Sequence, residues 1–233
     1  MRLPSDLVAE SLMAYLTEED RAHVVGLGPH RVFGAGETLL RQGDPTDHVL
    51  VLLHGWTRVL SRRADGQTVL IAFRGPGDVL GDLAALHGWV RTADVESLDE
   101  VTAVQLRAQE FGALLDQRPS VALAMIKQLA SRLREAENAR ADFATMHVTE
   151  RVATYLLWLS RTYGVRTDTG VALRVPFTQQ DVANRVGASL RAVARAFAVL
   201  RDRGIVINTR RQTVIARPDV LRAFVRDMPN GMD

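Results

Sequence analysis

The 233-residue sequence contains no cysteine. Disulfides, thiolate zinc sites and cysteine-ligated iron–sulfur clusters are therefore excluded, and the composition is compatible with a reducing cytosol. The first residues of the chain include acidic side chains and form no continuous apolar run, so they resemble neither a signal peptide nor a membrane span. We therefore expect a cytoplasmic protein with no membrane partner.

Catalytic and cofactor-binding motifs are also missing. The sequence has no P-loop and no GxSxG motif, and Gly75, Gly77 and Gly81 lack the strand-to-helix context of a dinucleotide fingerprint. The six histidines show no spacing that places two on one helical face, which disfavours a haem or metal site. The composition is 47% hydrophobic and 24% charged, as in ordinary globular proteins, and the chain is too short for a further catalytic domain. We expect no enzymatic activity.

The charges are segregated along the chain. Residues 148–233 hold 14 arginines against 7 carboxylates, a net charge of +7, whereas residues 1–147 hold 15 basic and 20 acidic residues, a net charge of −5. A basic domain beside an acidic one is expected when only one domain meets phosphate. All 14 basic residues of the second segment are arginine. The distribution indicates a nucleic-acid-binding C-terminal domain.

Residues 177–197 read as two short helices joined by a turn. Thr178 and Asp181 form the S/T-x-x-D/E pattern of a capping box, and Gly187 is suited to a turn that needs positive φ. Ser189 would cap the second helix. The apolar face of the first helix would consist of Val182, Ala183 and Val186. This pattern predicts a helix-turn-helix, and its alternative is an ordinary helical hairpin with a solvated arginine face.

The second of these helices would present arginines outward. Helical spacing predicts that Val193, Phe197 and Leu200 are buried. Leu190, Arg191 and Arg195 would then face outward, where a guanidinium group can reach base edges or phosphates.

Residues 204–216 read as two apolar strands around a polar turn that contains Arg210 and Arg211. Gly204 would end the preceding helix. Such a hairpin is typical of a winged helix, in which the turn contacts phosphates that flank the recognition helix; the alternative is a solvated hairpin tip. The predicted DNA contacts are Thr178, Gln179, Ser189, Leu190, Arg191, Arg195, Arg210 and Arg211.

The first hundred residues alternate short apolar segments with turn signals. Strand-like segments span residues 38–40, 49–53, 57–61, 68–73 and 101–106, with glycine or glycine–proline turns between them. An amphipathic segment over residues 12–25 precedes them, and a helical pattern follows over residues 120–146. The pattern favours an α+β protein whose strands form a β-roll or a barrel. We expect an N-terminal β-roll (double-stranded jelly-roll type, residues 1–117), a long dimerisation helix (residues 118–147) and a C-terminal winged helix-turn-helix (residues 148–233).

The long helical segment has apolar residues at heptad spacing. They are Ile126, Leu129, Leu133, Ala136 and Phe143, with Arg140 interrupting the series. Such a seam pairs with a second helix, either its copy in another subunit or the β domain of its own chain. We favour the homodimer, because a helix-turn-helix usually reads a pseudo-palindromic operator as a symmetric pair.

Residues 77–99 resemble the phosphate-binding cassette of cyclic-nucleotide-binding β-rolls, and together with the helix-turn-helix the chain is similar to the CRP/FNR family of transcription regulators. The resemblance implies that Gly81, Asp82, Leu83, Arg91 and Thr92 surround the effector, a cyclic nucleotide such as cyclic AMP. Arg91 would supply a countercharge to the cyclic phosphate, Thr92 would donate a hydroxyl hydrogen bond, and Asp82 would accept from the ribose 2′-hydroxyl. It also implies RNA polymerase as a partner.

Several positions depart from that family. Its cyclic-AMP sensors usually carry glutamate where Asp82 stands. On the dimer helix they carry adjacent hydroxyl residues that face the purine where Ala136 and Glu137 stand, so these two are also predicted effector residues. The cassette would therefore bind cyclic AMP weakly, bind a different nucleotide, or be a vestigial turn in which Arg91 pairs with Asp82 or Asp94. The vestigial case corresponds to a second function, an effector-independent DNA-organising protein.

The recognition helix departs as well. The best-known cyclic-AMP regulators present arginine, glutamate and arginine at the positions of Leu190, Arg191 and Arg195, so only Arg195 agrees. Leucine can contact a thymine methyl group but cannot form a bidentate pair with guanine. The operator should therefore differ from the usual TGTGA half-site.

Overall fold

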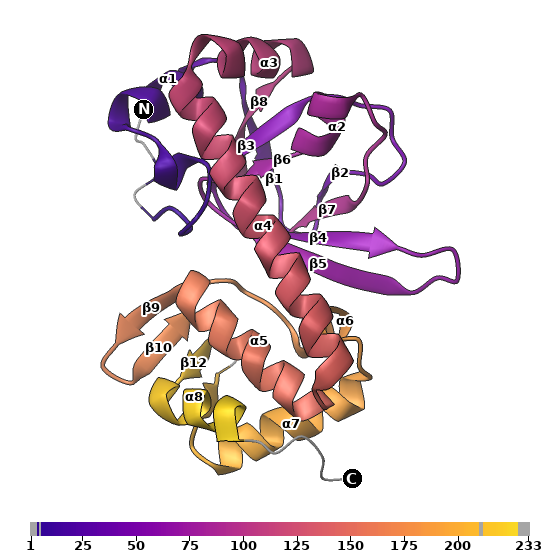
Figure 1. The fold of residues 1–233 in the computed structure, drawn as a ribbon, viewed down its shortest axis with the longest axis vertical. Helices are drawn as coiled ribbons and strands as arrows, with labels where there is room; N and C mark the ends of the chain where they lie inside the picture. The colour runs from indigo at the N-terminus through magenta and orange to yellow at the C-terminus, as the bar shows by residue number, and fades with distance from the viewer. Residues whose placement is uncertain (1–3, 5, 210–211, 228–233) are drawn as a thin grey trace. The chain divides into compact units, whose positions relative to one another are not determined.

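The computed structural model describes residues 4, 6–209 and 212–227 (Figure 1). The chain divides into two compact units, residues 1–133 and residues 134–233. The 27-residue helix α4 (Pro119–Thr145) contributes to both units.

The first unit contains two four-stranded antiparallel sheets. One sheet has the order β1-β8-β3-β6 and the other the order β2-β7-β4-β5 (Figure 1). Their strands are β1 (His30–Phe33), β2 (Thr38–Leu40), β3 (Val49–His54), β4 (Thr57–Arg62), β5 (Thr68–Arg74), β6 (Val79–Leu80), β7 (Asp94–Ser97) and β8 (Val101–Leu106). The predicted β-roll is confirmed.

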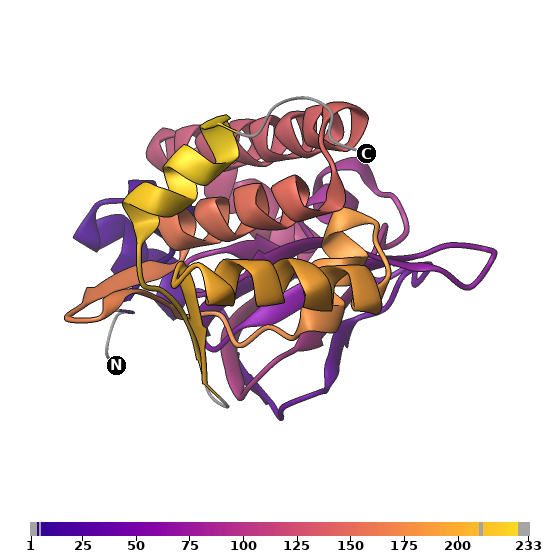
Figure 2. The same ribbon diagram turned by 90° about the horizontal axis from the view of Figure 1, so that it is seen from below.

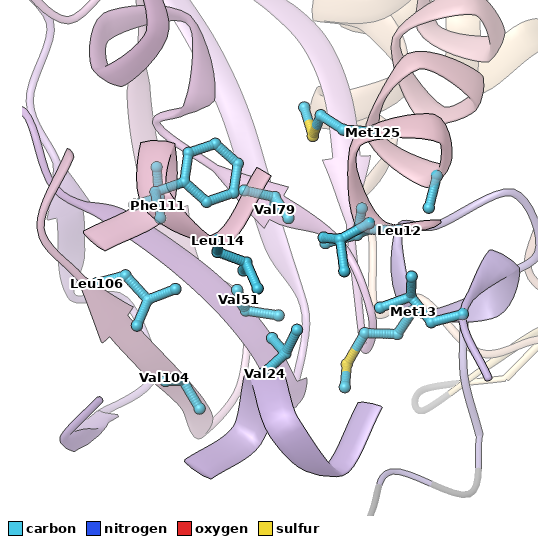
Figure 3. Packing of buried hydrophobic residues seen from close by; sticks show 14 of the residues in the cluster. Leu12, Met13, Val24, Val51, Val79, Val104, Leu106, Phe111, Leu114 and Met125 are labelled. Carbon is cyan, nitrogen blue, oxygen red and sulfur yellow. The ribbon is translucent and has the colours of Figure 1, made fainter. Parts of the chain in front are cut away.

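Strand β3 is buried on both faces, which explains its uninterrupted apolar sequence. Successive side chains of a strand point to opposite faces, so Val49 and Val51 join one core cluster while Leu50 and Leu52 join another. The second cluster lies between the sheets, and the first is covered by helices. Figure 3 shows the first cluster, which includes Val51 and Met125.

The helices that cover this cluster are η1 (Met13–Tyr15), α1 (Glu18–Gly26), α3 (Ala108–Gln117) and the first part of α4. The predicted amphipathic segment over residues 12–25 is interrupted at Thr17, whose hydroxyl caps α1 by accepting from the Asp20 amide. Asp20 in turn accepts from Arg118 Nη1 at 2.6 Å and from Ser120 Oγ at 2.7 Å. These bonds fasten α1 to the start of α4.

Helix α4 has one buried and one exposed face in the first unit. Val121, Ala124 and Met125 are buried in the core cluster. Leu123, Ile126 and Leu133 are 53%, 62% and 62% exposed. Leu129, predicted for the dimer seam, instead packs partly on the β-roll core. Leu129 therefore lies at the border between the core-facing stripe and the exposed stripe of α4, and its place in the seam stays a prediction.

The second unit packs helices against a small sheet. Helix α5 (Val148–Thr162) lies beside α7 (Leu190–Asp202) and α8 (Pro218–Asp227), and also contacts α6 (Gln179–Val186) (Figure 2). The sheet has the order β11-β12-β10-β9. Its strands are β9 (Gly164–Thr167), β10 (Gly170–Leu173), β11 (Val206–Asn208) and β12 (Thr213–Ile215). The predicted winged helix-turn-helix fold is confirmed, with β9, β10 and α8 as additions that the sequence pattern had not indicated.

The described residues lack two further features. None of their helices combines the length and the apolar character that a membrane crossing requires. No cluster of three or more histidine, aspartate or glutamate side chains among them could hold a metal ion.

Candidate functional site

The first helix of the predicted DNA reader begins at a reciprocal cap. The Asp181 amide donates to Thr178 Oγ1 at 3.1 Å, and the Thr178 amide donates to Asp181 Oδ2 at 2.8 Å. Asp181 is buried, so these bonds satisfy amides at the start of α6 that would otherwise lack partners. The capping box is confirmed.

The turn and the second helix follow the predicted pattern. Gly187 ends α6 with φ 59°, in the left-handed region that favours glycine. Ser189 Oγ then accepts from the Ala192 amide at 3.2 Å and starts α7. The predicted buried face of α7, consisting of Val193, Phe197 and Leu200, is fully buried.

The outward face of α7 is available for contact. Leu190 is 46% exposed, and Arg191 and Arg195 are exposed. Among the described residues, neither guanidinium takes part in a hydrogen bond or an ion pair. Thr178 is exposed and Gln179 is half-buried at the start of α6. Of the side chains predicted to contact DNA, those of the helix-turn-helix therefore lie at the start of α6 and on the first two turns of α7.

The hairpin after α7 is the expected wing. Gly204, with φ 65°, follows the helix, and the Ile205 amide donates back to the Leu200 carbonyl at 2.9 Å. Strands β11 and β12 pair with Val206 opposite Ile215, and β12 also pairs with β10. Arg210 and Arg211, predicted at the wing tip, lie outside the described residues.

Arg91 is the most deeply buried cation of the cassette, at 2% exposure. Its Nε donates to Thr46 Oγ1 at 2.9 Å, its Nη1 to the Gly81 carbonyl at 2.9 Å and its Nη2 to the His48 carbonyl at 2.5 Å. Burial lowers the pKa of Arg91, with three aspartates at longer range opposing the effect. No carboxylate among the described residues lies within ion-pair distance of it. Its charge is held by neutral acceptors.

Asp82 and Asp94 have other partners. Asp82 Oδ2 accepts from Arg132 Nη1 of α4 at 2.8 Å, and Asp94 pairs with Arg62. The alternative in which Arg91 pairs with one of these aspartates is therefore wrong. The reason is that Arg62 and Arg132 reach the two carboxylates from other elements of the same unit.

The cassette is joined to α4 by two polar side chains. Besides Asp82, Arg132 donates through Nη2 to the Val79 carbonyl at 2.5 Å. One helical turn earlier, Gln128 Nε2 donates to Asp78 Oδ1 at 2.7 Å, and Gln128 is buried. The sequence contains a signal for these contacts, because Gln128 and Arg132 are polar residues four apart within the buried face of α4.

The remaining predicted effector residues are spread over both units. Gly81 has φ 79° and caps helix α2 (Asp82–His87), and a Cβ there would meet the Arg91 guanidinium. Leu83 is 40% exposed on α2, and Thr92 is exposed. Ala136 and Glu137 are exposed on the part of α4 that belongs to the second unit.

Thr46 and His48, which hold Arg91, had no sequence signal because they lie 45 and 43 residues from it. Burial lowers the pKa of His48, and the nearby charge of Arg91 lowers it further.

Sequence models of known protein families match the two parts of the chain separately. Residues 30–118 match the sequence model of the cyclic nucleotide-binding domain, and residues 150–224 match that of the Crp-like helix-turn-helix domain. The two matches define a DNA-binding transcription regulator with a sensor-type domain ahead of its DNA-binding domain.

One curated relative is the CRP-like cAMP-activated global transcriptional regulator of Mycobacterium tuberculosis, 33% identical over 174 residues, which are 74% of this chain and 77% of the relative. The nitrogen fixation regulation protein FixK of Bradyrhizobium diazoefficiens is 29% identical over 185 residues, 77% of this chain and 75% of the relative. The chain belongs to the CRP/FNR family of transcription regulators. These relatives are regulators, not enzymes, in agreement with the expectation from the sequence.

Solved structures share the fold at lower identity. A mutant of CooA from Carboxydothermus hydrogenoformans gives a TM-score of 0.75 at 16% identity, covering 96% of this chain and 98% of that one. FixK2 from Bradyrhizobium japonicum gives a TM-score of 0.72 at 23% identity, covering 84% of this chain and 96% of that one.

Proposed function

We propose that the protein works as a homodimer whose affinity for a pseudo-palindromic DNA operator is set by a small anionic effector of the cyclic nucleotide class. The observation that carries this proposal is the state of Arg91, a buried guanidinium bonded only to neutral acceptors. A desolvated cation without a directly paired carboxylate is unfavourable, and a phosphate beside it would offset part of that cost. The M. tuberculosis relative is named as cAMP-activated, so cyclic AMP is the first effector to test.

The link from the cassette to α4 supports control by such an effector. Asp82 begins α2, and Arg132 of α4 holds its carboxylate at 2.8 Å. A ribose hydroxyl that bonds to Asp82 would compete for the same oxygen atoms and so favour a different position of Arg132. The effector would thereby act by shifting the population of α4 arrangements.

The exposed stripe of α4 supports the dimer. Leu123, Ile126 and Leu133 are all more than half exposed although they are large and apolar. They recur at spacings of three and seven, as in the seam of a two-stranded coiled coil. Covering them with the same helix of a second copy would remove this surface from water, and a symmetric pair would place the two recognition helices ~34 Å apart on DNA.

The predicted DNA contacts at the start of α6, on α7 and in the wing form part of this proposal. We further propose that the protein acts in the cytoplasm and that RNA polymerase is a partner of the DNA-bound dimer, as the family resemblance implies.

The effector-independent alternative also has an observation in its favour. Three donors of Arg91 already have acceptors, and Asp82 already has a cationic partner. A cassette satisfied in this way could serve only to support the β-roll, and the protein would then bind DNA without an effector.

Calorimetric titration of the full chain with cyclic AMP, cyclic GMP and cyclic di-GMP distinguishes the effector-controlled regulator from the effector-independent alternative. Loss of a charge-assisted pair in Arg91→Gln should weaken nucleotide binding by about 2 kcal/mol. Because that change could also disturb the cassette, Thr92→Ala serves as a second variant, since Thr92 is exposed and makes no hydrogen bond within the described residues. Arg63→Gln, an exposed charge between β4 and β5, is the matched control.

Operator affinity is then measured with and without each nucleotide, on a site selected from random DNA. A nucleotide that binds through Arg91 and changes operator affinity supports the proposal. Saturating nucleotides that change neither the melting temperature nor operator affinity would overturn it in favour of the DNA-organising alternative.

A further inference from the structure

The second unit contains a cavity of about 200 Å³ away from the recognition face of α7. It is half open to solvent and is lined by residues of the last part of α4, of α5 and of the end of α6. Its lining combines aromatic rings and cations, namely Phe143, Tyr155, Trp158, Arg151, Arg161 and Arg185.

The cations of this cavity outnumber its carboxylates. Of the three arginines, only Arg185 forms an ion pair, with Glu135 at 3.2 Å. Arg151 donates to the Met146 carbonyl at 3.0 Å and lies over the Phe143 ring, 5.1 Å from its centroid. Arg161 is exposed and takes part in no hydrogen bond or ion pair with a described residue. Two guanidinium groups therefore line the cavity without a countercharge.

Three buried donors in the lining also lack acceptors among the described residues. They are Nε of Arg151, Nε of Arg185 and the hydroxyl of Tyr155. Buried polar groups are nearly always hydrogen-bonded, and leaving one unpaired is unfavourable. Their presence in the lining of one cavity indicates that the cavity is suited to a ligand with acceptor oxygens.

Helix α5 contributes two arginines and two aromatic residues to the lining of the cavity. Arg151, Tyr155, Trp158 and Arg161 recur at spacings of four, three and three, so they lie along one side of the helix. The Trp158 and Tyr155 rings are stacked, with centroids 5.7 Å apart. An aromatic surface is thus flanked on both sides by cations.

The volume of the cavity suits a small ligand. A cavity of about 150 Å³ accommodates a benzene ring, whereas drug-sized or nucleotide-sized ligands occupy roughly 300 Å³ or more. The carboxylates of Glu135 and Asp142 in the same lining disfavour a multiply charged anion.

We propose that this cavity binds a monocyclic aromatic carboxylate. Its ring would lie among the aromatic side chains, and its carboxylate would accept hydrogen bonds from Arg151 and the Tyr155 hydroxyl. This site is separate from the cassette in the first unit and does not depend on a cyclic nucleotide. Since Arg185 and Val186 of the lining end α6, a bound ligand would also contact the first helix of the helix-turn-helix.

The test is calorimetric titration of the full chain with benzoate as the probe. Benzoate should bind with a dissociation constant on the order of 1 mM or below. Benzamide, which has the same shape without the charge, and acetate, which has the charge without the ring, should each bind at least about tenfold more weakly.

Four variants locate the site. Tyr155→Phe keeps the ring and removes only the hydroxyl, and Arg151→Gln removes the charge, so both should weaken benzoate binding about tenfold. Ala139→Leu places extra atoms in the lining and should abolish binding. Arg166→Gln, an exposed charge on β9, is the matched control and should leave it unchanged.

The proposal is overturned if benzamide binds as tightly as benzoate, if no heat of binding is seen with benzoate, or if folded Tyr155→Phe and Ala139→Leu proteins both bind benzoate normally. Arg91→Gln should leave benzoate binding intact. Failure of this site and failure of the cassette are therefore distinguishable.

Discussion

Arg185 and Glu135 form an ion pair in the second unit, with Nη2 of the arginine 3.2 Å from Oε1 of the glutamate and both side chains less than one-seventh exposed. Arg185 also lies over the Tyr155 ring, 5.4 Å from its centroid. Glu135 belongs to α4 and Arg185 to the last turn of α6. The pair therefore fastens the first helix of the helix-turn-helix to the end of the long helix.

Glu135→Gln should lower the free energy of unfolding of the second unit by about 2 to 4 kcal/mol, because it leaves the Arg185 charge buried without its partner. Chemical denaturation measures this change, and removing both charges should restore part of the loss. Glu137→Gln, two residues on and exposed, should change it by less than about 0.5 kcal/mol. Equal effects of the two substitutions would show that the pair contributes nothing.

Gly187→Ala should destabilise the second unit more than Gly204→Ala. Both glycines have positive φ, 59° and 65°, so each alanine carries about 1 kcal/mol or more of backbone strain. At Gly187 the added Cβ would also meet the Phe143 ring, whereas nothing lies within 4 Å at Gly204. Thermal unfolding of the two variants gives the comparison. Equal melting temperatures of the two variants would show that the Phe143 ring moves aside without lowering the stability.

Arg195→Ala should cost ~1 to 3 kcal/mol of binding energy per half-site and relax the preference at one base pair, because we expect Arg195 to contact guanine. Arg201→Ala, on the last turn of the same helix, is the control and should leave base preference unaltered. Site selection from random DNA followed by salt titration measures both properties. A uniform loss of affinity in Arg195→Ala, with no change of preference, would make Arg195 a phosphate contact.

Leu133→Asp should dissociate the proposed dimer, because it would bury a charge in an apolar seam. Leu133 is 62% exposed in the single chain, so the substitution should leave the fold of each subunit intact. Light scattering measures the mass, and Ile71→Asp, at an exposed apolar residue of β5, is the control. A wild-type protein that scatters as a monomer would contradict this expectation.

Asp20→Asn should destabilise the first unit at neutral pH but not in acid. Hydrogen bonds from Ser120 and Arg118 lower the pKa of Asp20 below its ordinary value of 3.8. A lowered carboxyl pKa contributes stability above the ordinary value, and that contribution is lost as the pH falls through the lowered pKa. Melting temperatures of wild type and variant should therefore begin to approach each other as the pH falls below about 4, and they should converge only below the lowered pKa of Asp20. Glu18→Gln, exposed on the same helix, should show no such convergence.

The helix-turn-helix could be predicted closely because its signals are local. Thr178 and Asp181 cap each other across three residues, and the buried face of α7 follows directly from helical spacing. The β-roll was indicated by its turns, although the sequence could not show that β3 is covered on both faces. The β9–β10 hairpin was missed even though Asp168 lies in its turn and Gly170 follows directly, the kind of residues that mark tight turns.

The surroundings of Arg91 could not be predicted, because its three acceptors come from segments 10, 43 and 45 residues away. The same holds for the partners of Asp82 and Asp94, which the fold brings together from α4 and β4. Sequence spacing identifies which residues share a helix face, but it does not determine which charges meet across a fold. The sequence therefore predicted which residues form the cassette, but not their hydrogen-bond and ion-pair partners.

The cations exposed on α7 are arginines, and residues 148–233 contain no lysine. Lysine acetylation removes a positive charge from many DNA-binding surfaces, and here it has no side chain to modify. Lysine-directed acylating reagents would likewise leave this unit unlabelled while they reach Lys127 on α4. If the proposed effector controls DNA binding, lysine acetylation of this unit cannot be the means, and the effector would act on the positions of the arginines.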